Sequence, residues 1–285
     1  MTSEIEIKKL KRKDGNNKDI NIKGGIVLEG FPSSTGFINA IASECLIRST
    51  KTDLVAYLDS PDFPPMSVVN NYVPQYPVRI YVNEGLKVAF FVSDINVEKI
   101  LQRDVAKAIL NWARENECKL IISAQGIVPL PPPPSNSHSE NVKEGNSTQE
   151  DTTNEDSKGT TTTASTSTSH PDLTKIYAVT STESAARLIV EHSSYFKHLR
   201  DGTLTGIPAI LLNEGALTNL DVIVFLVNVL PNIPDFHAAA VVSEAVSRII
   251  PNISCDIGAL MVEARIIENR INNVRAEQKR ISYIA

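Results

Sequence analysis

The alternation of apolar runs and polar turns along the chain predicts a protein built from both strands and helices. Short apolar runs bounded by Gly, Pro, Asn or Asp indicate strands, whereas apolar residues that recur every three or four positions indicate helices. The expected strands are residues 25–29, 54–58, 78–82, 87–92, 120–123, 176–179 and 222–227. The expected helices are residues 36–48, 105–112, 185–191, 207–217 and a segment that Asp235 caps and Pro251 ends.

The order of these elements predicts one mixed sheet covered by helices on both faces. Residues 78–82 and 87–92 are separated by Asn83-Glu84-Gly85 and therefore indicate a hairpin. The continuous apolar run 222–227 is typical of a strand buried on both faces. We therefore expect an α/β fold in which residues 23–130 and 171–252 share a sheet and form a single domain.

Two segments outside this domain are expected to lack a core of their own. Residues 1–22 predict a flexible leader, whose basic cluster Lys8–Lys13 is either solvated or a contact arm for an acidic partner. Residues 131–170 are rich in Ser, Thr, Asn and Glu and cannot bury enough apolar surface to offset their ordering entropy. They predict a disordered insertion, either a tolerated surface loop or a regulatory tether.

The last segment, residues 253–285, predicts a C-terminal helix and tail. Its apolar residues alternate in steps of four and three, which keeps one seam along a helix. This seam consists of Ile253, Ile257, Leu260, Ala264, Ile267, Ile271 and Val274. Packing on the parent domain accounts for its first half. Beyond Ile271 the charge density predicts a projecting helix, and there the seam is a candidate surface for self-association.

Composition and charge reduce the number of possible functions. The 285 residues carry a formal net charge of −5, so nothing attracts the chain to nucleic acid or to an anionic membrane, and we expect neither as a partner. The first residues lack the apolar core of a signal peptide, and no apolar run reaches the length of a membrane span. Cys45, Cys118 and Cys255 lie far apart, which suggests neither a zinc site nor a disulfide framework. We expect a soluble protein of the reducing cytoplasm.

The stretch EGFPSSTGF, residues 29–37, is the candidate phosphate-binding loop. A P-loop needs the pattern G-x-x-x-x-G-K-[ST], because backbone amides surround the phosphates while the Lys neutralises their charge. Here five residues separate Gly30 from Gly36, and Phe37 stands where the Lys would be. The pattern favours a strand-to-helix connection, with only the anion affinity of any helix N-terminus.

The candidate catalytic groups are scattered along the chain. Asp59, Asp62 and Asp94 stand at strand ends, where α/β proteins often place active groups, but no His lies near them in sequence. Strand-end aspartates are usually caps or turn formers. The five histidines are His138 and His170 in the insertion, His192, His198 and His237. We expect no catalytic residue, no cofactor and no metal ion.

Prolines beside aromatic residues form three clusters, at residues 31–32, 63–66 and 72–77. Such stiff segments present apolar surface at a low entropic cost, which suits contact with another protein. They also suit the covering of a sheet edge. Both interpretations stay open from the sequence.

Four stretches in order resemble the proteasome assembly chaperone family in its archaeal form. They are LEGFPSSTGFINAIASECLI (28–47), VAYLDSPDFPPMSVVNN (55–71), GTLTGIPAILLNEG (202–215) and PDFHAAAVVSEAVSRIIP (234–251). The terminal helix, with its run of Glu and Arg, agrees with the family too. The resemblance covers nearly the whole chain except the leader and the insertion.

This resemblance implies a non-enzymatic assembly chaperone or adaptor with a three-layer α/β/α sandwich like that of nucleoside phosphorylases and a long C-terminal helix. It also implies that the chain forms a homo-oligomer and binds proteasome α subunits or a related complex. Family members dock through a C-terminal tail of a hydrophobic residue, Tyr and any residue, which enters pockets between α subunits. The corresponding partner-binding residues here are Tyr283, Ile284 and Ala285, with the tyrosine one place earlier than in the family pattern.

Two other functions are considered beside this one. A nucleotide-dependent enzyme, such as an ATP-dependent carboxylate–amine ligase, fits the α/β pattern and the Gly30–Gly36 loop, but that loop lacks the Lys and the magnesium ligands. A scaffold fits the Ser/Thr-rich insertion, which phosphorylation would switch.

Overall fold

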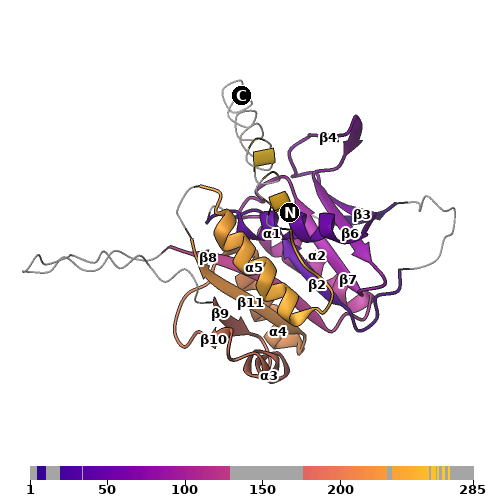
Figure 1. Cartoon of the computed structure of the whole chain (residues 1–285). Helices are drawn as coiled ribbons and strands as arrows, with labels where there is room; N and C mark the ends of the chain where they lie inside the picture. The colour runs from indigo at the N-terminus through magenta and orange to yellow at the C-terminus, as the bar shows by residue number, and fades with distance from the viewer. Residues whose placement is uncertain are drawn as a thin grey trace, which may run out of the picture.

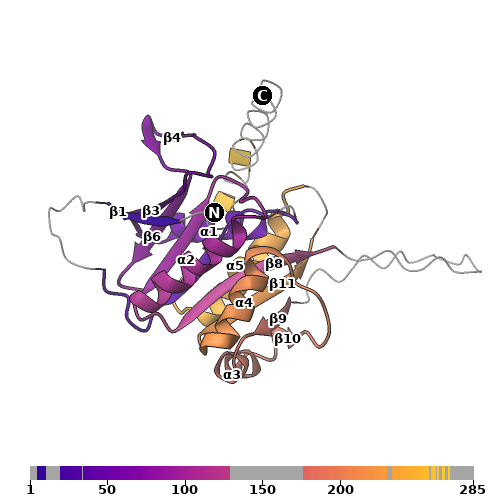
Figure 2. The same ribbon diagram turned by 180° about the vertical axis from the view of Figure 1, so that it is seen from behind.

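The computed structural model describes residues 5–10, 20–33, 35–128, 176–229, 233–256 and 258–260, with the single positions 262, 265, 266 and 269. In this part of the chain, nine strands form one sheet in the order β1-β3-β6-β7-β2-β8-β11-β9-β10, and β4 pairs with β5 in a separate hairpin. The two halves of the predicted domain therefore share one sheet, as the sequence indicates (Figures 1 and 2).

Four parallel strands form the centre of the sheet. They are β7 (Val88–Ser93), β2 (Ile26–Gly30), β8 (Leu120–Ile127) and β11 (Asp221–Asn228). Successive residues of a strand point to opposite faces, so Phe90 joins the hydrophobic cluster on one face and Phe91 the cluster on the other. Burial on both faces explains why these strands are continuous apolar runs.

Antiparallel pairing extends the sheet on both sides, which makes it mixed. Next to β7 lie β6 (Val78–Asn83), β3 (Asp53–Asp59) and β1 (Glu6–Lys9). Next to β11 lie β9 (Ile176–Thr180), which is antiparallel to it, and β10 (Phe196–His198). The predicted hairpin of residues 78–82 and 87–92 is confirmed as β6 and β7.

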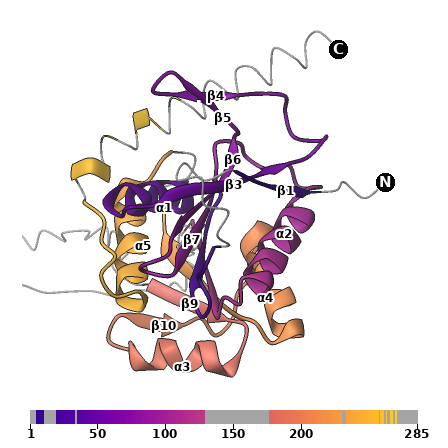
Figure 3. The same cartoon turned by 90° about the vertical axis from the view of Figure 1, so that its right-hand side faces the viewer.

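Helices cover both faces, as the sequence predicts (Figure 3). On one face lie α1 (Ile38–Ser49) and α5 (Phe236–Ile249), and on the other lie α2 (Gln102–Glu115) and α4 (Gly206–Thr218). The short α3 (Glu183–Glu191) packs beside β9 and β10. Each face encloses its own hydrophobic cluster, so the fold is a three-layer arrangement.

The prediction of a flexible leader is wrong for residues 6–9. Residues 1–22 were expected to be flexible, but β1 (Glu6–Lys9) pairs antiparallel with β3. Ile5 and Ile7 alternate with charged residues and pack against the cluster on the α2 face. A strand of four residues with charged neighbours gives too short an alternation to stand out in the sequence.

A second hairpin is also absent from the sequence expectations. Strands β4 (Val68–Asn70) and β5 (Val73–Gln75) are three residues each and project from the body (Figures 1 and 2). Asn71 and Tyr72 between them have φ angles of 48° and 65°. Two consecutive positive φ angles are the mark of a type I′ turn, which matches the twist of a tight hairpin.

Most of the predicted insertion and tail lies outside the described residues. This holds for all of residues 131–170 and 271–285. Residues 258–260 are helical, which is the beginning of the predicted C-terminal segment.

A disulfide joins α1 to the segment after α5, and the sequence expectation of no disulfide is therefore wrong. Cys45 and Cys255 are bonded, with Cα atoms 5.5 Å apart and a sequence separation of 210. Helices α1 and α5 pack against each other, and the chain after α5 returns along α1, so Ile253 is buried in the same cluster. The spacing of the cysteines in the sequence does not show that Cys45 and Cys255 come close together in the fold. Cys118 is buried and free, and burial raises its pKa to about 12, which keeps the thiol protonated and unreactive.

The disulfide should contribute measurably to stability because it closes a long loop of the unfolded chain. We expect the double variant Cys45→Ala/Cys255→Ala to lose about 2–4 kcal/mol of unfolding free energy in urea titration. A thiol reductant should destabilise the wild-type protein and the Cys118→Ala control, and leave the double variant unchanged. Equal stability of the wild-type protein with and without reductant would contradict the role given to this bond.

Candidate functional site

A buried carboxylate organises the loop that follows β2. Glu29 Oε1 accepts a hydrogen bond from the Phe31 amide at 2.8 Å. Its Oε2 accepts hydrogen bonds from Asn39 Nδ2 at 2.8 Å and from Ser123 Oγ at 2.6 Å. Asn39 Nδ2 also donates to the Ala124 carbonyl at 2.7 Å. These contacts connect β2, the loop, α1 and β8, and burial raises the pKa of Glu29 to about 7.

The same loop passes very close to β8. A Cβ atom at Gly126 would lie 2.6 Å from the Thr35 carbonyl oxygen, so only glycine fits this position. At the end of the loop Phe37 has a φ of 53° and its side chain is buried. The described residues 29–33 and 35–37 thus lead from β2 to α1, with Phe37 in the core where a P-loop would carry its Lys.

The three candidate aspartates have separate structural contacts. Asp94 is buried, and its Oδ2 lies 2.5 Å from Arg79 Nη1. Asp59 forms an ion pair with Lys8 at 2.7 Å. The Asp62 amide donates to Ser60 Oγ at 3.3 Å within a turn. Each contact belongs to a turn or strand end, which is the role that the sequence favoured for these residues.

The described histidines lie on different elements. His192 Nδ1 is 3.0 Å from the Leu188 carbonyl at the end of α3, and His198 is exposed on β10. His237 is exposed in the first turn of α5. His138 and His170 lie outside the described residues. Among the residues that the structure describes, no group of three or more His, Cys, Asp or Glu is placed to hold a metal ion.

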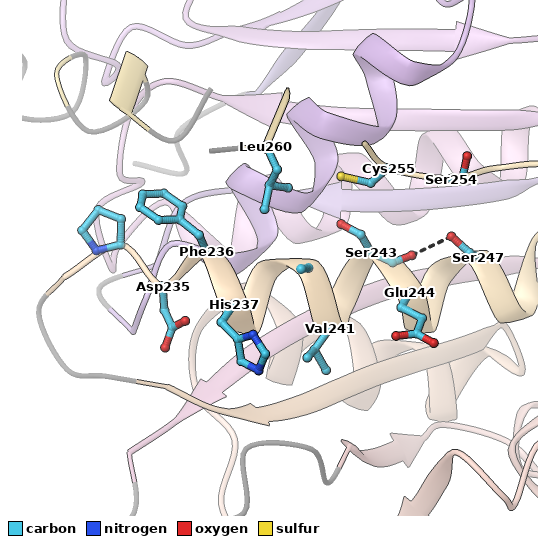
Figure 4. A pocket seen from close by; sticks show the side chains of 12 residues that line it. Asp235, Phe236, His237, Val241, Ser243, Glu244, Ser247, Ser254, Cys255 and Leu260 are labelled. Atoms are coloured by element: carbon cyan, nitrogen blue, oxygen red, sulfur yellow. Dashed lines mark hydrogen bonds between the residues drawn. The ribbon is translucent and has the colours of Figure 1, made fainter. Parts of the chain in front are cut away.

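A groove of about 760 Å³ runs along α5 and is the strongest candidate for a protein-binding site (Figure 4). One wall is the outer side of α5, with Phe236 and Val241 half-buried and exposed to the groove. Ser254, Cys255 and Leu260 line the groove from the segment that follows α5. Its lining is mainly apolar; the acidic residues that line it are the exposed Glu244 on α5 and Asp235, the buried N-cap of that helix.

The disulfide and two buried side chains hold the second wall of this groove. Cys255 is bonded to α1, and Ile253 and Leu260 are buried in the hydrophobic cluster beneath α1 and α5. Ile253 and Leu260 belong to the first half of the predicted seam, and both pack on the parent domain as expected. The other seam residues and the predicted tail residues lie outside the described part of the chain; they are Ile257, Ala264, Ile267, Ile271, Val274, Tyr283, Ile284 and Ala285.

Large apolar side chains are also exposed near this end of the chain and on the β4–β5 hairpin. Val262 is 64% exposed, and Tyr72 at the hairpin tip is 100% exposed. Tyr76, by contrast, stacks on Tyr57 with ring centroids 3.6 Å apart, and Phe63 is buried in the core. The aromatic clusters therefore divide between the two roles that the sequence left open. Some cover the fold, and the hairpin tip presents apolar surface.

The comparisons with known proteins agree with this architecture. The model of the PAC2 family matches residues 27–275, and the chain belongs to that family. The family resemblance read from the four sequence stretches is thereby confirmed. No helix in the described part of the chain is long and apolar enough to cross a bilayer.

Three relatives illustrate the similarity. The structure of PbaA from Pyrococcus furiosus, an archaeal homolog of proteasome-assembly chaperone, matches with a TM-score of 0.67 and 22% identity over 92% of this chain and 96% of that one. PbaB from the same organism, an archaeal proteasome activator, matches with a TM-score of 0.62 and 21% identity over 96% and 100% of the two chains. An uncharacterized protein of Methanocaldococcus jannaschii is 28% identical over 109 residues, which are 38% of this chain and 44% of that protein. The matched region is thus less than half of this curated relative.

The sequence analysis missed the groove, because it needs α5 and residues 254–260 to lie side by side. A signal was nevertheless present. Phe236, Ala240 and Val241 form an apolar stripe on α5 beside the stripe that enters the core, and this second stripe packs against the core but is only partly buried.

Glu29 should make stability depend on pH around neutrality. Burial raises its pKa from the ordinary value of 4.5 to about 7, so the folded chain keeps a proton that the unfolded chain releases. The stabilisation is complete below pH 4.5 and is lost as the pH rises through 7, by about 3 kcal/mol in total. Between pH 5 and 8 the wild-type protein should therefore lose unfolding free energy relative to Glu29→Gln, measured by urea titration. The exposed Glu115→Gln serves as control. Parallel pH curves for the wild type and Glu29→Gln would refute the assignment.

Proposed function

We propose that this protein is a non-enzymatic assembly chaperone or adaptor of the cytoplasm, which forms a homo-oligomer and binds proteasome α subunits or a related complex. Family membership over residues 27–275 supports this proposal. It is also supported by the similar structures of PbaA and PbaB, of which one is a homolog of proteasome-assembly chaperone and the other a proteasome activator.

The observation that carries the proposal is the apolar groove beside α5. A mainly apolar hollow of about 760 Å³ suits a protein segment that inserts apolar side chains and presents polar groups at the rim. Of the two acidic residues that line it, Glu244 is exposed on α5 and pairs with Arg248, whereas Asp235 is the buried N-cap of α5 and accepts a hydrogen bond from the Ala238 amide. The geometry supports binding of another protein more directly than it supports the making or breaking of bonds.

The C-terminal segment has two further roles in this proposal. Its seam beyond Leu260, from Ala264 to Val274, contacts other copies of the chain. The tail residues Tyr283, Ile284 and Ala285 bind the partner. Both roles rest on the sequence pattern, and the disulfide at Cys255 fixes the base of this segment to the domain.

A binding experiment with isolated proteasome α subunits tests the proposal. The full chain should bind, and Val241→Glu should weaken binding about tenfold or more, because a charge in an apolar contact removes a central anchor. The matched control is Val190→Glu on α3, since Val190 is also an exposed valine, 60% accessible, and lies away from the groove. A chain truncated after Lys279 separates the role of the tail from that of the groove.

Absence of α-subunit binding by both the full and the truncated chain would overturn the chaperone assignment. Binding that Val241→Glu and Val190→Glu reduce equally would overturn the role of the groove. The mass of the full chain in solution, measured by light scattering, tests self-association separately, and a monomer at high concentration would contradict it.

A further inference from the structure

A second cavity, of about 680 Å³, is lined in part by the loop that Glu29 organises. It is formed at the carboxyl ends of β2 and β7, by residues that follow these strands, and by Ala124 and Gln125 in the second half of β8. The helix after β2 covers one face of the sheet, and the helix after β7 covers the other (Figure 3). Neighbouring parallel strands whose helices leave toward opposite faces open a crevice between them, where α/β proteins bind ligands. The volume lies in the range of small-molecule sites.

Three helices begin at this cavity. Asn39, Gln102 and Gly206, which line it, stand in the first turns of α1, α2 and α4. The N-cap residues of these three helices supply no side-chain hydrogen bond to the first amides. In contrast, Thr182 and Asp235 cap α3 and α5 with side-chain oxygens. The cavity is therefore surrounded by helix N-termini whose partial positive charges favour an anion.

The side chain of Asn39 indicates, independently of the helix N-termini, that the cavity can receive a hydrogen-bond donor of a ligand. Asn39 is only 4% exposed, and its Nδ2 donates to both Glu29 and the Ala124 carbonyl. This arrangement fixes the orientation of the amide, because both of those partners are acceptors. The remaining atom, Oδ1, has no hydrogen-bond partner among the described residues and is not fully enclosed, so it is open to the cavity that Asn39 lines. A ligand hydroxyl or N–H group in the cavity would satisfy it.

The other lining groups fit a ligand that is charged at one end and polar at the other. Lys99 supplies a cation, and Ser33, Thr35 and Thr205 supply hydroxyl groups. The carboxylate of Glu98 also lines the cavity and opposes an anion. At the buried end, Glu29 has its pKa raised to about 7 by burial and takes up a proton readily, which limits repulsion.

We propose that this cavity binds a phosphate monoester of a small hydroxylated molecule, such as a sugar phosphate or a nucleoside monophosphate. The phosphate lies at the N-termini of α2 and α4 near Lys99, and a hydroxyl or N–H group of the ligand donates to Asn39 Oδ1. The site binds its ligand without breaking a bond. It is separate from the groove beside α5, so it extends the proposed function and does not depend on it.

Calorimetric titration and thermal unfolding of the full chain test this proposal with four probes at millimolar concentration. Ribose 5-phosphate and AMP distinguish the two sources of the monoester, while inorganic phosphate and adenosine each carry one half of its chemistry. At least one monoester should bind and raise the Tm, because a ligand of the native state stabilises it. It should bind more tightly than inorganic phosphate and adenosine do.

Thr205→Asp is the decisive variant. Aspartate is a favoured N-cap, so it should preserve or raise the stability of α4 while its carboxylate occupies the amides and repels the phosphate. We expect monoester affinity to fall about tenfold or more in Thr205→Asp and to remain in Thr205→Ser. Lys99→Ala should weaken it roughly two- to fivefold, whereas the exposed Lys107→Ala on α2 should not.

The proposal is overturned if neither monoester binds the wild-type chain, or if Thr205→Asp folds and retains full affinity. Binding of inorganic phosphate as tight as that of the esters would overturn the assignment of Asn39 Oδ1, and binding of adenosine as tight as AMP would overturn the phosphate site. None of these results affects binding to α subunits, so the two proposals fail separately.

Discussion

Burial of the four central parallel strands on both faces is the constraint on which the rest of the structure depends. Phe90 and Phe91 point to opposite sides of β7, so neither side of the sheet can face water. Helices therefore form a layer on each face of the sheet. The helix that follows β2 lies on one face, and the helix that follows β7 lies on the other (Figure 3). Because these two helices diverge, the carboxyl ends of β2 and β7 stay uncovered between the helical layers, and the polar cavity lies there.

Burial of the Glu29 carboxyl group in this interior is energetically unfavourable. An isolated buried charge is strongly unfavourable, and three donors from the loop, from α1 and from β8 compensate it only in part, because burial still raises the pKa of Glu29 to about 7. The same contacts determine the path of the loop. With the Phe31 amide directed to Glu29 and the side chain of Phe37 in the core, the loop cannot surround a phosphate in the manner of a P-loop. An anion at this end of the sheet would therefore bind at the N-termini of α2 and α4 and not within the loop.

The two surfaces of interest depend on different parts of the fold. The apolar groove needs the segment after α5 to stay beside that helix, and the Cys45–Cys255 bond together with buried Leu260 holds it there. The polar cavity needs only the sheet and the three helix N-termini around it. A protein partner and a small ligand could therefore occupy the chain at the same time.

The sequence by itself determined the elements, the mixed character of the sheet and the family. Strands such as 222–227 and helices such as 36–48 follow from the spacing at which apolar residues recur, and this spacing is a local property of the chain. It could not determine β1 or the β4–β5 hairpin, whose runs are too short to show a period. Neither could it determine the disulfide, the groove or the free oxygen of Asn39, because each depends on residues that are far apart in the chain. Only the packing of α1 against α5 and of β2 against β8 brings those residues together, and hydrophobic burial, which drives that packing, does not encode which distant side chains will meet.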